Sequence, residues 1–220
     1  MKKSTWIILG IVAVIAIWAV AGYNGLVNKD EKVSETFSQL DNTYKRRADL
    51  IPNLVETVKK YTDYEGSALK EVTEARTAAQ NVTLDLSNAT QEQINAYFKA
   101  QEQVGSSLSK LIAVAESYPD LKAIESFKDL QSQLEGTENR IATARKDWIE
   151  ATKSYNVSTR RFPNNILASL FGFEQKAYFE ASEAERETPK VGDLFGEYNL
   201  DIFSDKNTKS LKFNALCLVF

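Results

Sequence analysis

The sequence predicts an all-α protein: an N-terminal transmembrane helix followed by an elongated antiparallel bundle of three long helices plus a short C-terminal helix. Three observations predict this fold. An uncharged run lies near the N-terminus, apolar residues recur every three or four positions over most of the remaining chain, and helix breakers are scarce. The 220 residues include only four prolines and nine glycines, so long uninterrupted helices are expected. A chain of this length can also bury a substantial core.

The predicted membrane anchor is the uncharged run WIILGIVAVIAIWAVAG, residues 6–22. A helix of this length spans roughly 26 Å, enough for the hydrocarbon core of a bilayer. Trp6, Trp18 and Tyr23 lie near its two ends, where amphipathic aromatic side chains prefer the headgroup level. We therefore predict that residues 1–22 form a transmembrane helix and that the lipid bilayer is one partner.

A cleaved secretory signal is the alternative interpretation of this segment. MKK forms a basic start and Ala19-Val20-Ala21 an A-x-A cleavage site. Two features favour retention: the apolar run is longer than most signal cores, and bulky Trp18 lies just ahead of the site. Cleavage after Ala21 would release a secreted or periplasmic binding module, and a mature chain that begins near Gly22 would establish it.

Charges on the two sides of the anchor bear on its orientation. Lys2 and Lys3 precede the apolar run, and Lys29 and Lys32 follow it, so the positive-inside rule is nearly balanced. The free amino terminus tips the balance toward a cytoplasmic N-terminus. The bundle is therefore expected on the non-cytoplasmic side.

The first part of the bundle has helical spacing from Val33 to Tyr61. Apolar side chains recur there every three or four residues, with a coiled-coil character. A second run, from Leu69 to Ala79, continues this pattern. The sequence VTLDLSNA at 82–89 breaks the pattern and predicts a loop.

The later helices have clear start and stop signals. The sequence TQEQ at 90–93 is a capping box for the second long helix, which ends at Tyr118-Pro119. The longest run of helical spacing extends from 121 to 155. Pro163 can start a short helix, and Gly172 can end it.

These patterns divide the chain into three parts. Residues 1–22 are the predicted anchor, residues 23–173 the helical bundle, and residues 174–220 a C-terminal extension. The end of the extension, residues 192–220, mixes aromatic side chains, lysines and an apolar terminus. Docking on the bundle, a small hairpin and disorder all remain open for it.

The composition excludes several classes of function. The chain has no histidine and one cysteine, Cys217. Nucleophile–histidine pairs and the usual zinc sites are therefore absent. We predict no catalytic residues, no metal site and no cofactor. From Tyr23 onward, 25 lysines and arginines face 30 aspartates and glutamates. This acidic balance gives no general attraction for phosphate backbones, so nucleic acid is not an expected partner.

A proline interrupts the first bundle helix within KRRADLIPNLVE, residues 45–56. Pro52 removes a backbone hydrogen bond and clashes with the carbonyl four residues earlier, at a cost of about 3 kcal/mol unless a kink or a new helix start absorbs it. Asp49 is placed to cap a restarted turn, and Arg46 or Arg47 to pair with a carboxylate. Two interpretations stay open: a kinked helix with solvated charges, or a notch that exposes carbonyls and arginines for docking.

A second polar cluster lies in QLEGTENRIATAR, residues 133–145. Glu138, Asn139, Arg140 and Arg145 are the candidates for a polar layer between helices. Glu138 and Arg145 are seven residues apart and share one helix face, whereas Arg140 points away from it. An ion-pair layer that sets the helix register is one interpretation, and a docking site is the other.

Seven short blocks occur in one order along residues 6–191. They are YN at 23–24, RRADLIPNLV at 46–55, YPDLKA at 118–123, FKDLQSQLEGTENRIATAR at 127–145, YN at 155–156, FP at 162–163 and YFEAS at 178–182. Together they closely resemble the LemA family of bacterial membrane proteins. The RxDLIPNLV and TENRI..AR blocks are specific. The resemblance implies a retained anchor in the bacterial inner membrane, a bundle without established catalytic activity, and interactions at the cell envelope.

The chain departs from the family pattern at three places. Tyr64 stands where the family often has a histidine before the glutamate, and Trp148-Ile149 where a Tyr-Asn or similar pair is common. Relatives tend to stop soon after the PKV seen at 189–191, whereas this chain continues for 29 residues. The resemblance supplies no catalytic role that these changes would disturb.

The sequence therefore predicts a single-pass membrane protein whose non-catalytic bundle is an interaction or scaffold module at the cell envelope. Other envelope proteins or peptides are the expected partners, and a homo-oligomer is also considered. Besides the cleaved binding module, a third hypothesis is a membrane-bound enzyme that uses only carboxylates and lysines. That hypothesis requires a concave pocket with two carboxylates of divergent acidity.

Overall fold

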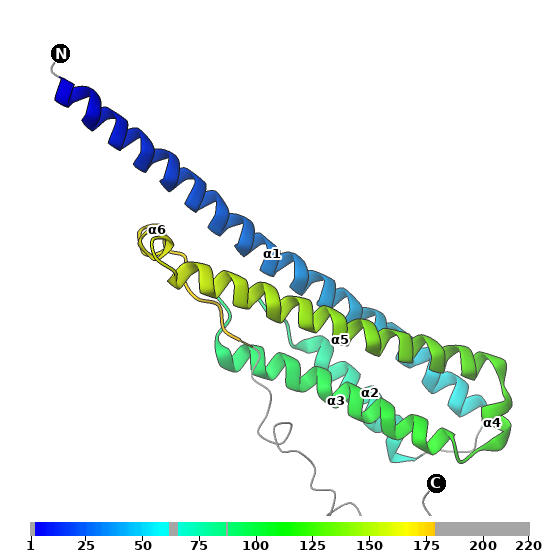
Figure 1. The fold of residues 1–220 in the computed structure, drawn as a ribbon. Helices are drawn as coiled ribbons and strands as arrows, with labels where there is room; N and C mark the ends of the chain where they lie inside the picture. The colour runs from blue at the N-terminus through cyan, green and yellow to red at the C-terminus, as the bar shows by residue number, and fades with distance from the viewer. Residues whose placement is uncertain (1–2, 62–65, 87, 179–220) are drawn as a thin grey trace, which may run out of the picture. The chain divides into compact units, whose positions relative to one another are not determined.

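All regular secondary structure in the described part of the chain is helical (Figure 1). The computed structural model describes residues 3–61, 66–86 and 88–178. Its helices are α1 (Lys3–Tyr61), α2 (Ser67–Asn81), α3 (Gln91–Ala115), α4 (Pro119–Ala123), α5 (Glu125–Arg160) and α6 (Asn164–Phe171). The predicted fold class, all-α with an apolar N-terminal helix, is confirmed.

The long helix α1 carries both the apolar run and the first side of the bundle. It is continuous over 59 residues, so no break separates residues 3–22 from the bundle. Large apolar side chains between Trp6 and Val20 are exposed. Within the described residues, α1 is the one helix long and apolar enough to cross a membrane. Pro52 lies inside α1, so the structure does not contain the restarted turn that Asp49 was expected to cap.

The predicted first bundle helix is two helices in the structure. Its second run of apolar residues forms α2, which packs along α3, while α1 packs along α5 (Figure 1). The longest predicted helix is also divided, because Pro119 starts the short α4 and Ile124 lies between α4 and α5. The bundle thus consists of two helix pairs, α1 with α5 and α2 with α3.

Two clusters of buried apolar side chains fill this bundle. We call the one nearer the apolar run of α1 the proximal core, and the other the distal core. Fully buried members of the proximal core include Val33, Leu40, Ile94, Phe98 and Trp148. Those of the distal core include Ile51, Leu54, Val72, Leu111, Leu121 and Phe127. Each large apolar side chain buried in this way contributes about 1.5–3 kcal/mol of stability.

Local signals set the helix ends as predicted. Thr90 Oγ1 accepts a hydrogen bond from the Gln93 backbone N–H at 3.3 Å, and Gln93 Oε1 accepts one from the Thr90 N–H at 2.9 Å. This is the expected capping box of α3. Gly172 ends α6 in the left-handed conformation, with φ of 73°, which a residue without a Cβ adopts at little cost.

The chain after α6 turns back along the bundle. Asn156 Nδ2 donates to the Lys176 carbonyl at 2.7 Å, and the Lys176 N–H donates to Asn156 Oδ1 at 2.9 Å. Tyr155 Oη donates to the Glu174 carbonyl at 2.9 Å. Residues 173–178 therefore pack on the bundle, beyond its predicted end at 173. The rest of the extension, with the three options for residues 192–220, lies outside the described residues.

Candidate functional site

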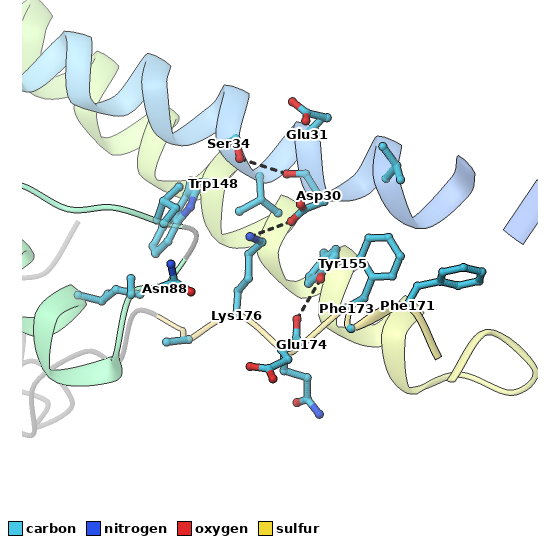
Figure 2. A pocket seen from close by; sticks show the side chains of 18 of the residues that line it. Asp30, Glu31, Ser34, Asn88, Trp148, Tyr155, Phe171, Phe173, Glu174 and Lys176 are labelled. Carbon is cyan, nitrogen blue, oxygen red and sulfur yellow. Dashed lines mark hydrogen bonds and ion pairs between the residues drawn. The ribbon is translucent and has the colours of Figure 1, made fainter. Parts of the chain in front are cut away.

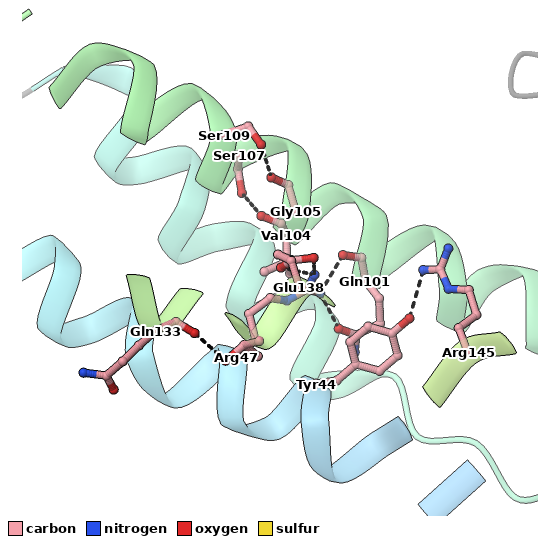
Figure 3. A network of polar contacts seen from close by, with 11 residues as sticks. Tyr44, Arg47, Gln101, Val104, Gly105, Ser107, Ser109, Gln133, Glu138 and Arg145 are labelled. Carbon is pink, nitrogen blue, oxygen red and sulfur yellow. Dashed lines mark hydrogen bonds and ion pairs between the residues drawn. The ribbon is translucent and has the colours of Figure 1, made fainter. Parts of the chain in front are cut away.

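A buried arginine joins three helices of the bundle (Figure 3). Arg47 on α1 is only 3% exposed. Its Nη2 donates to the carbonyl oxygen and to Oε1 of Gln101 on α3, at 2.7 and 2.9 Å. Its Nη1 donates to Glu138 Oε1 on α5 at 3.1 Å. One guanidinium therefore connects three helices, with the fixed planar geometry that suits several acceptors at once.

A second arginine extends this network toward the proximal core. Arg145 Nη2 donates to Tyr44 Oη at 2.9 Å, and its Nη1 lies 3.9 Å from Glu102 Oε1. The guanidinium also lies over the Phe98 ring, 5.4 Å from the centroid. Burial raises the pKa of Tyr44 above its ordinary value, although Arg145 opposes the rise. Tyr44 is therefore a neutral hydroxyl that bonds to a cation at physiological pH.

We call Tyr44, Arg47, Gln101, Glu138 and Arg145 the polar layer. It lies between the two apolar clusters: Tyr44 and Ile141 belong to the proximal core, whereas Ile51 and Leu134 belong to the distal core. A buried guanidinium without acceptors is costly. The layer therefore fits one axial alignment of α1, α3 and α5, and any shift along the axis would separate Arg47 from its acceptors.

The structure separates the candidate residues that the sequence grouped together. Arg47 is buried, whereas Arg46 and Asp49 are exposed. Glu138 and Arg145 reach the polar layer, as their shared helix face predicts. The other two members of that predicted cluster, Asn139 and Arg140, are exposed, and their side chains stay outside the hydrogen-bond network that joins the described helices. Arg140 follows Glu138 by two residues, so helical rotation turns it away from Glu138, whereas Asn139 lines a groove between α3 and α5.

Sequence reasoning did not select Gln101 or Arg76. Gln101 occupies a buried position in the apolar stripe of α3 that also contains Ile94, Val104 and Leu108. A polar residue in such a stripe is a usable signal, because buried polar groups need partners. Arg76 had no comparable signal, since its contact depends on how α2 folds against α1.

Arg76 on α2 contacts α1 next to Pro52, in the stretch for which the sequence predicts a kink or a docking notch. Arg76 Nε donates to the Ala48 carbonyl oxygen at 2.7 Å. Pro52 has no N–H, so it cannot supply the usual helical hydrogen bond to that oxygen. A cavity of ≈ 280 Å³ lies beside this contact, and its lining includes Lys45, Asp49 and Arg76. The freed carbonyl is thus bound by the protein's own α2.

A larger groove lies between α3 and α5, which make no extensive contact with each other along their length. Its volume is ≈ 640 Å³. Leu108 and Ile112 from α3 and Leu134 and Ile141 from α5 supply apolar lining. Arg47, Gln101, Glu102, Glu138, Asn139 and Arg145 supply polar lining. The residues from each helix recur at steps of three or four, so two helix faces form the walls.

The third candidate site is a cavity of ≈ 820 Å³ beside the end of the apolar run (Figure 2). Asp30 Oδ1 and Lys176 Nζ form an ion pair across it at 2.8 Å. Burial raises the pKa of Tyr155 to about 12, and the Asp30 carboxylate adds to the rise. The Trp148 indole N–H is buried and has no hydrogen-bond acceptor among the described residues.

The carboxylates of this cavity do not form the pair that an acid–base enzyme needs. Asp30 is bound to Lys176, and the other two acidic residues in the lining, Glu31 and Glu174, are exposed. Among the described residues, no group of three or more histidine, cysteine, aspartate or glutamate side chains is placed to hold a metal ion. This cavity therefore does not supply the pair of carboxylates that the carboxylate-enzyme hypothesis requires.

Comparison with known proteins gives a consistent family match. A family model described as LemA family matches residues 36–192. The magnetosome protein MamQ 2 of Paramagnetospirillum magneticum is 27% identical over 194 residues, which cover 80% of this chain and 71% of that protein. Protein LemA of Metamycoplasma hominis is 23% identical over 163 residues, covering 74% and 71%. Neither name is that of an enzyme. With the long apolar helix, these similarities indicate a membrane-associated helical protein.

Proposed function

The chain belongs to the LemA family, and from this premise we propose that it is a single-pass inner-membrane protein whose non-catalytic bundle binds a helical segment of another envelope protein. The groove between α3 and α5 carries the proposal. It has apolar side chains on both walls, polar side chains among them, and a length that follows two helices. Those are the features of the helix-in-groove mode of recognition.

The shape of the groove favours a helix as the occupant. Leu108 and Ile112 are four residues apart on α3, and Leu134 and Ile141 are seven apart on α5. Such rows accept the side chains of a third helix laid between them, as ridges fit into grooves in helix packing. Leu108, Leu134 and Ile141 are already almost fully buried, so a partner helix with an apolar stripe would chiefly cover the half-buried Ile112 and the packing gap that α3 and α5 leave between them.

The polar layer gives the groove a rigid base. Arg47 lies in its lining and is bound to Gln101 on one wall and Glu138 on the other. Arg145 bridges toward Glu102 across the same space. A preorganised surface loses less conformational entropy on binding than a flexible one. The interhelical ion pairs therefore support a binding role while they also align the helices.

A non-catalytic role agrees with the residues available. The chain has no histidine. Of the three glutamates that line the groove, Glu102 and Glu138 are paired with arginines and Glu135 is exposed. The relatives' names, a magnetosome protein and LemA, do not describe enzymes. The anchor in α1 would hold the groove close to the membrane, where other envelope proteins are concentrated.

Site-specific photo-crosslinking in the native membrane tests this function. A photoreactive amino acid replaces Ile112, which lines the groove and is half-buried. Asp147 is the matched control, because it is exposed on the opposite face of α5. We expect a light-dependent adduct at 112 but not at 147, and mass spectrometry should map it to a helical segment of a second membrane-associated protein.

A groove-filling variant makes the test specific. Gly105 lies in the groove lining, and a Cβ added there would meet Arg47 Nη1 at an ordinary 3.5 Å. Gly105→Leu should therefore fill part of the groove and reduce the adduct at 112, and helical circular dichroism of the variant checks that its fold is intact. Equal adducts at 112 and 147, or an adduct to another part of the same chain, would refute the proposal.

A further inference from the structure

The short helix α6 exposes an apolar surface that the bundle does not cover. Phe162, Ile166, Leu170 and Phe171 are 76%, 54%, 73% and 53% exposed. The sequence from Phe162 to Phe173, FPNNILASLFGF, contains no charged residue. Ile166 and Leu170 are four residues apart and share one face of α6, whereas Phe171 lies toward α1, where it packs on Tyr23. Exposed apolar side chains grouped in this way usually mark an interaction site.

The face of α6 that carries Leu167 and Ala168 packs on the end of the apolar run of α1, and Figure 1 shows α6 beside α1. Leu167 and Ala168 are buried in a small cluster with Leu26, against which Trp18 and Ala19 pack. The approach is close at Gly22, where an added Cβ would lie 2.5 Å from Leu167 Cδ1. The helix α6 therefore lies at the level of the last turns of residues 6–22.

From this contact we infer, on the basis of the proposed membrane span, that α6 and Phe162 insert into the surface of the same bilayer that α1 would cross. The contact residues Trp18, Ala19 and Gly22 belong to the uncharged run itself. One helical turn rises about 5.4 Å, and interfacial helices bury their apolar face about 5–10 Å into the boundary of headgroups and acyl chains. An element packed on the last turn of a membrane span is within that depth.

Aromatic and basic neighbours fit this position. Tyr23 packs edge-on against Phe171 and Phe173, with ring centroids 4.9 and 5.6 Å apart. Amphipathic and aromatic rings concentrate at membrane interfaces. Arg160 and Arg161 are exposed immediately before Phe162, where their guanidinium groups would reach lipid phosphates.

The consequence is a second membrane contact for the bundle. With α1 alone, the bundle could rotate about the anchor. With α6 inserted beside it, the face of the bundle that carries α6 is held toward the lipid. The lipid surface, rather than a second protein, is favoured because the apolar surface is continuous with the membrane span.

Spin labels on the full chain in single-copy nanodiscs test this inference. Cys217→Ser removes the native thiol, and single variants Ile166→Cys and Leu170→Cys carry the label. Ser132→Cys, on an exposed position of α5, is the control. Molecular oxygen concentrates in lipid, and a nickel chelate stays in water. We expect oxygen to relax the spin labels at 166 and 170 more strongly than the nickel chelate does. At 132 we expect the nickel chelate to relax the label more strongly than oxygen does.

Two results would overturn the inference. Greater relaxation by the nickel chelate at 166 and 170 would place α6 in water. Exclusion of both reagents would show that protein covers this surface. Labels at already exposed side chains disturb the fold little, and helical circular dichroism of each labelled chain checks that it is intact.

Discussion

Arg76 binds the carbonyl oxygen of Ala48 through its Nε at a distance of 2.7 Å. This oxygen is the one that Pro52, four residues further along α1, cannot engage, because proline has no N–H. The proline that interrupts the first bundle helix therefore creates an acceptor, and α2 supplies the donor. The hydrogen bond that α1 lacks at this proline is replaced by one between α2 and α1.

This relationship predicts that the stability lost on replacing Arg76 depends on whether position 52 is a proline. Arg76→Met should destabilise the bundle by about 1–2 kcal/mol, because the Ala48 carbonyl loses a charged donor. In a Pro52→Ala background the same substitution should cost less than half as much, since an alanine at position 52 restores a backbone N–H for that oxygen. Thermal unfolding followed by circular dichroism in detergent micelles measures both costs. Arg140→Met, at an exposed position, is the control; an unchanged cost of Arg76→Met in the second background would contradict the account.

The polar layer predicts a second dependence. Gln101→Leu removes the Oε1 acceptor from a guanidinium that is almost fully buried, and we expect a loss of about 1–3 kcal/mol. Arg47→Met removes the buried charge, and with it the need for hydrogen-bond acceptors. In the Arg47→Met background, Gln101→Leu should therefore cost little further stability. Gln103→Leu, an exposed neighbour on α3, controls for the change of side chain. If Gln101→Leu costs the same with and without Arg47, the two residues are not coupled.

The sequence was most informative where a local signal sets the structure. The uncharged run at 6–22, the capping box at 90–93 and the closing Gly172 each act within one helix, and each was predicted. The break after Tyr61 was not, because the spacing of apolar residues continues into α2. A pattern of spacing defines a helix face, but it does not say whether two helical segments share one axis.

The candidate site was predictable only in part, for the same reason. Glu138 and Arg145 share a face by helical geometry, so their common role could be expected. Their partners Tyr44 and Gln101 lie on other helices, and the contact depends on the axial alignment of three helices. Arg46 and Arg47 are adjacent in the sequence, yet only Arg47 faces the core. Tertiary packing, not residue type, distinguishes them.

Tyr155 predicts a loss of stability at alkaline pH. Burial raises its pKa to about 12 in the folded protein, above the ordinary value near 10. The folded state therefore holds the proton more tightly. The contribution of Tyr155 to the free energy of unfolding is complete below about pH 10 and is lost as the pH rises toward 12. For one titrating group this loss is at most about 1.4 kcal/mol per pH unit. Thermal unfolding midpoints measured from pH 8 to 11.5 should therefore decline less steeply in the Tyr155→Phe variant than in the parent protein. Tyr61→Phe, on the exposed surface, is the control; parallel declines in Tyr155→Phe and the parent would exclude Tyr155 as the cause.

The contact between α6 and α1 also predicts that the anchor is retained. Cleavage after Ala21 would cut α1 next to Gly22, against which Leu167 packs, and would remove Trp18 and Ala19 from the α6 cluster. We therefore expect the protein extracted from membranes to have the mass of the full chain. Ala21→Gln, which blocks a signal peptidase site, should have a mass that differs only by the substitution. A product of the parent chain that begins at Gly22, and is absent in the Ala21→Gln variant, would instead establish the released binding module. Because α6 would then lack Trp18 and Ala19, that product should also unfold at a lower temperature than the uncleaved variant.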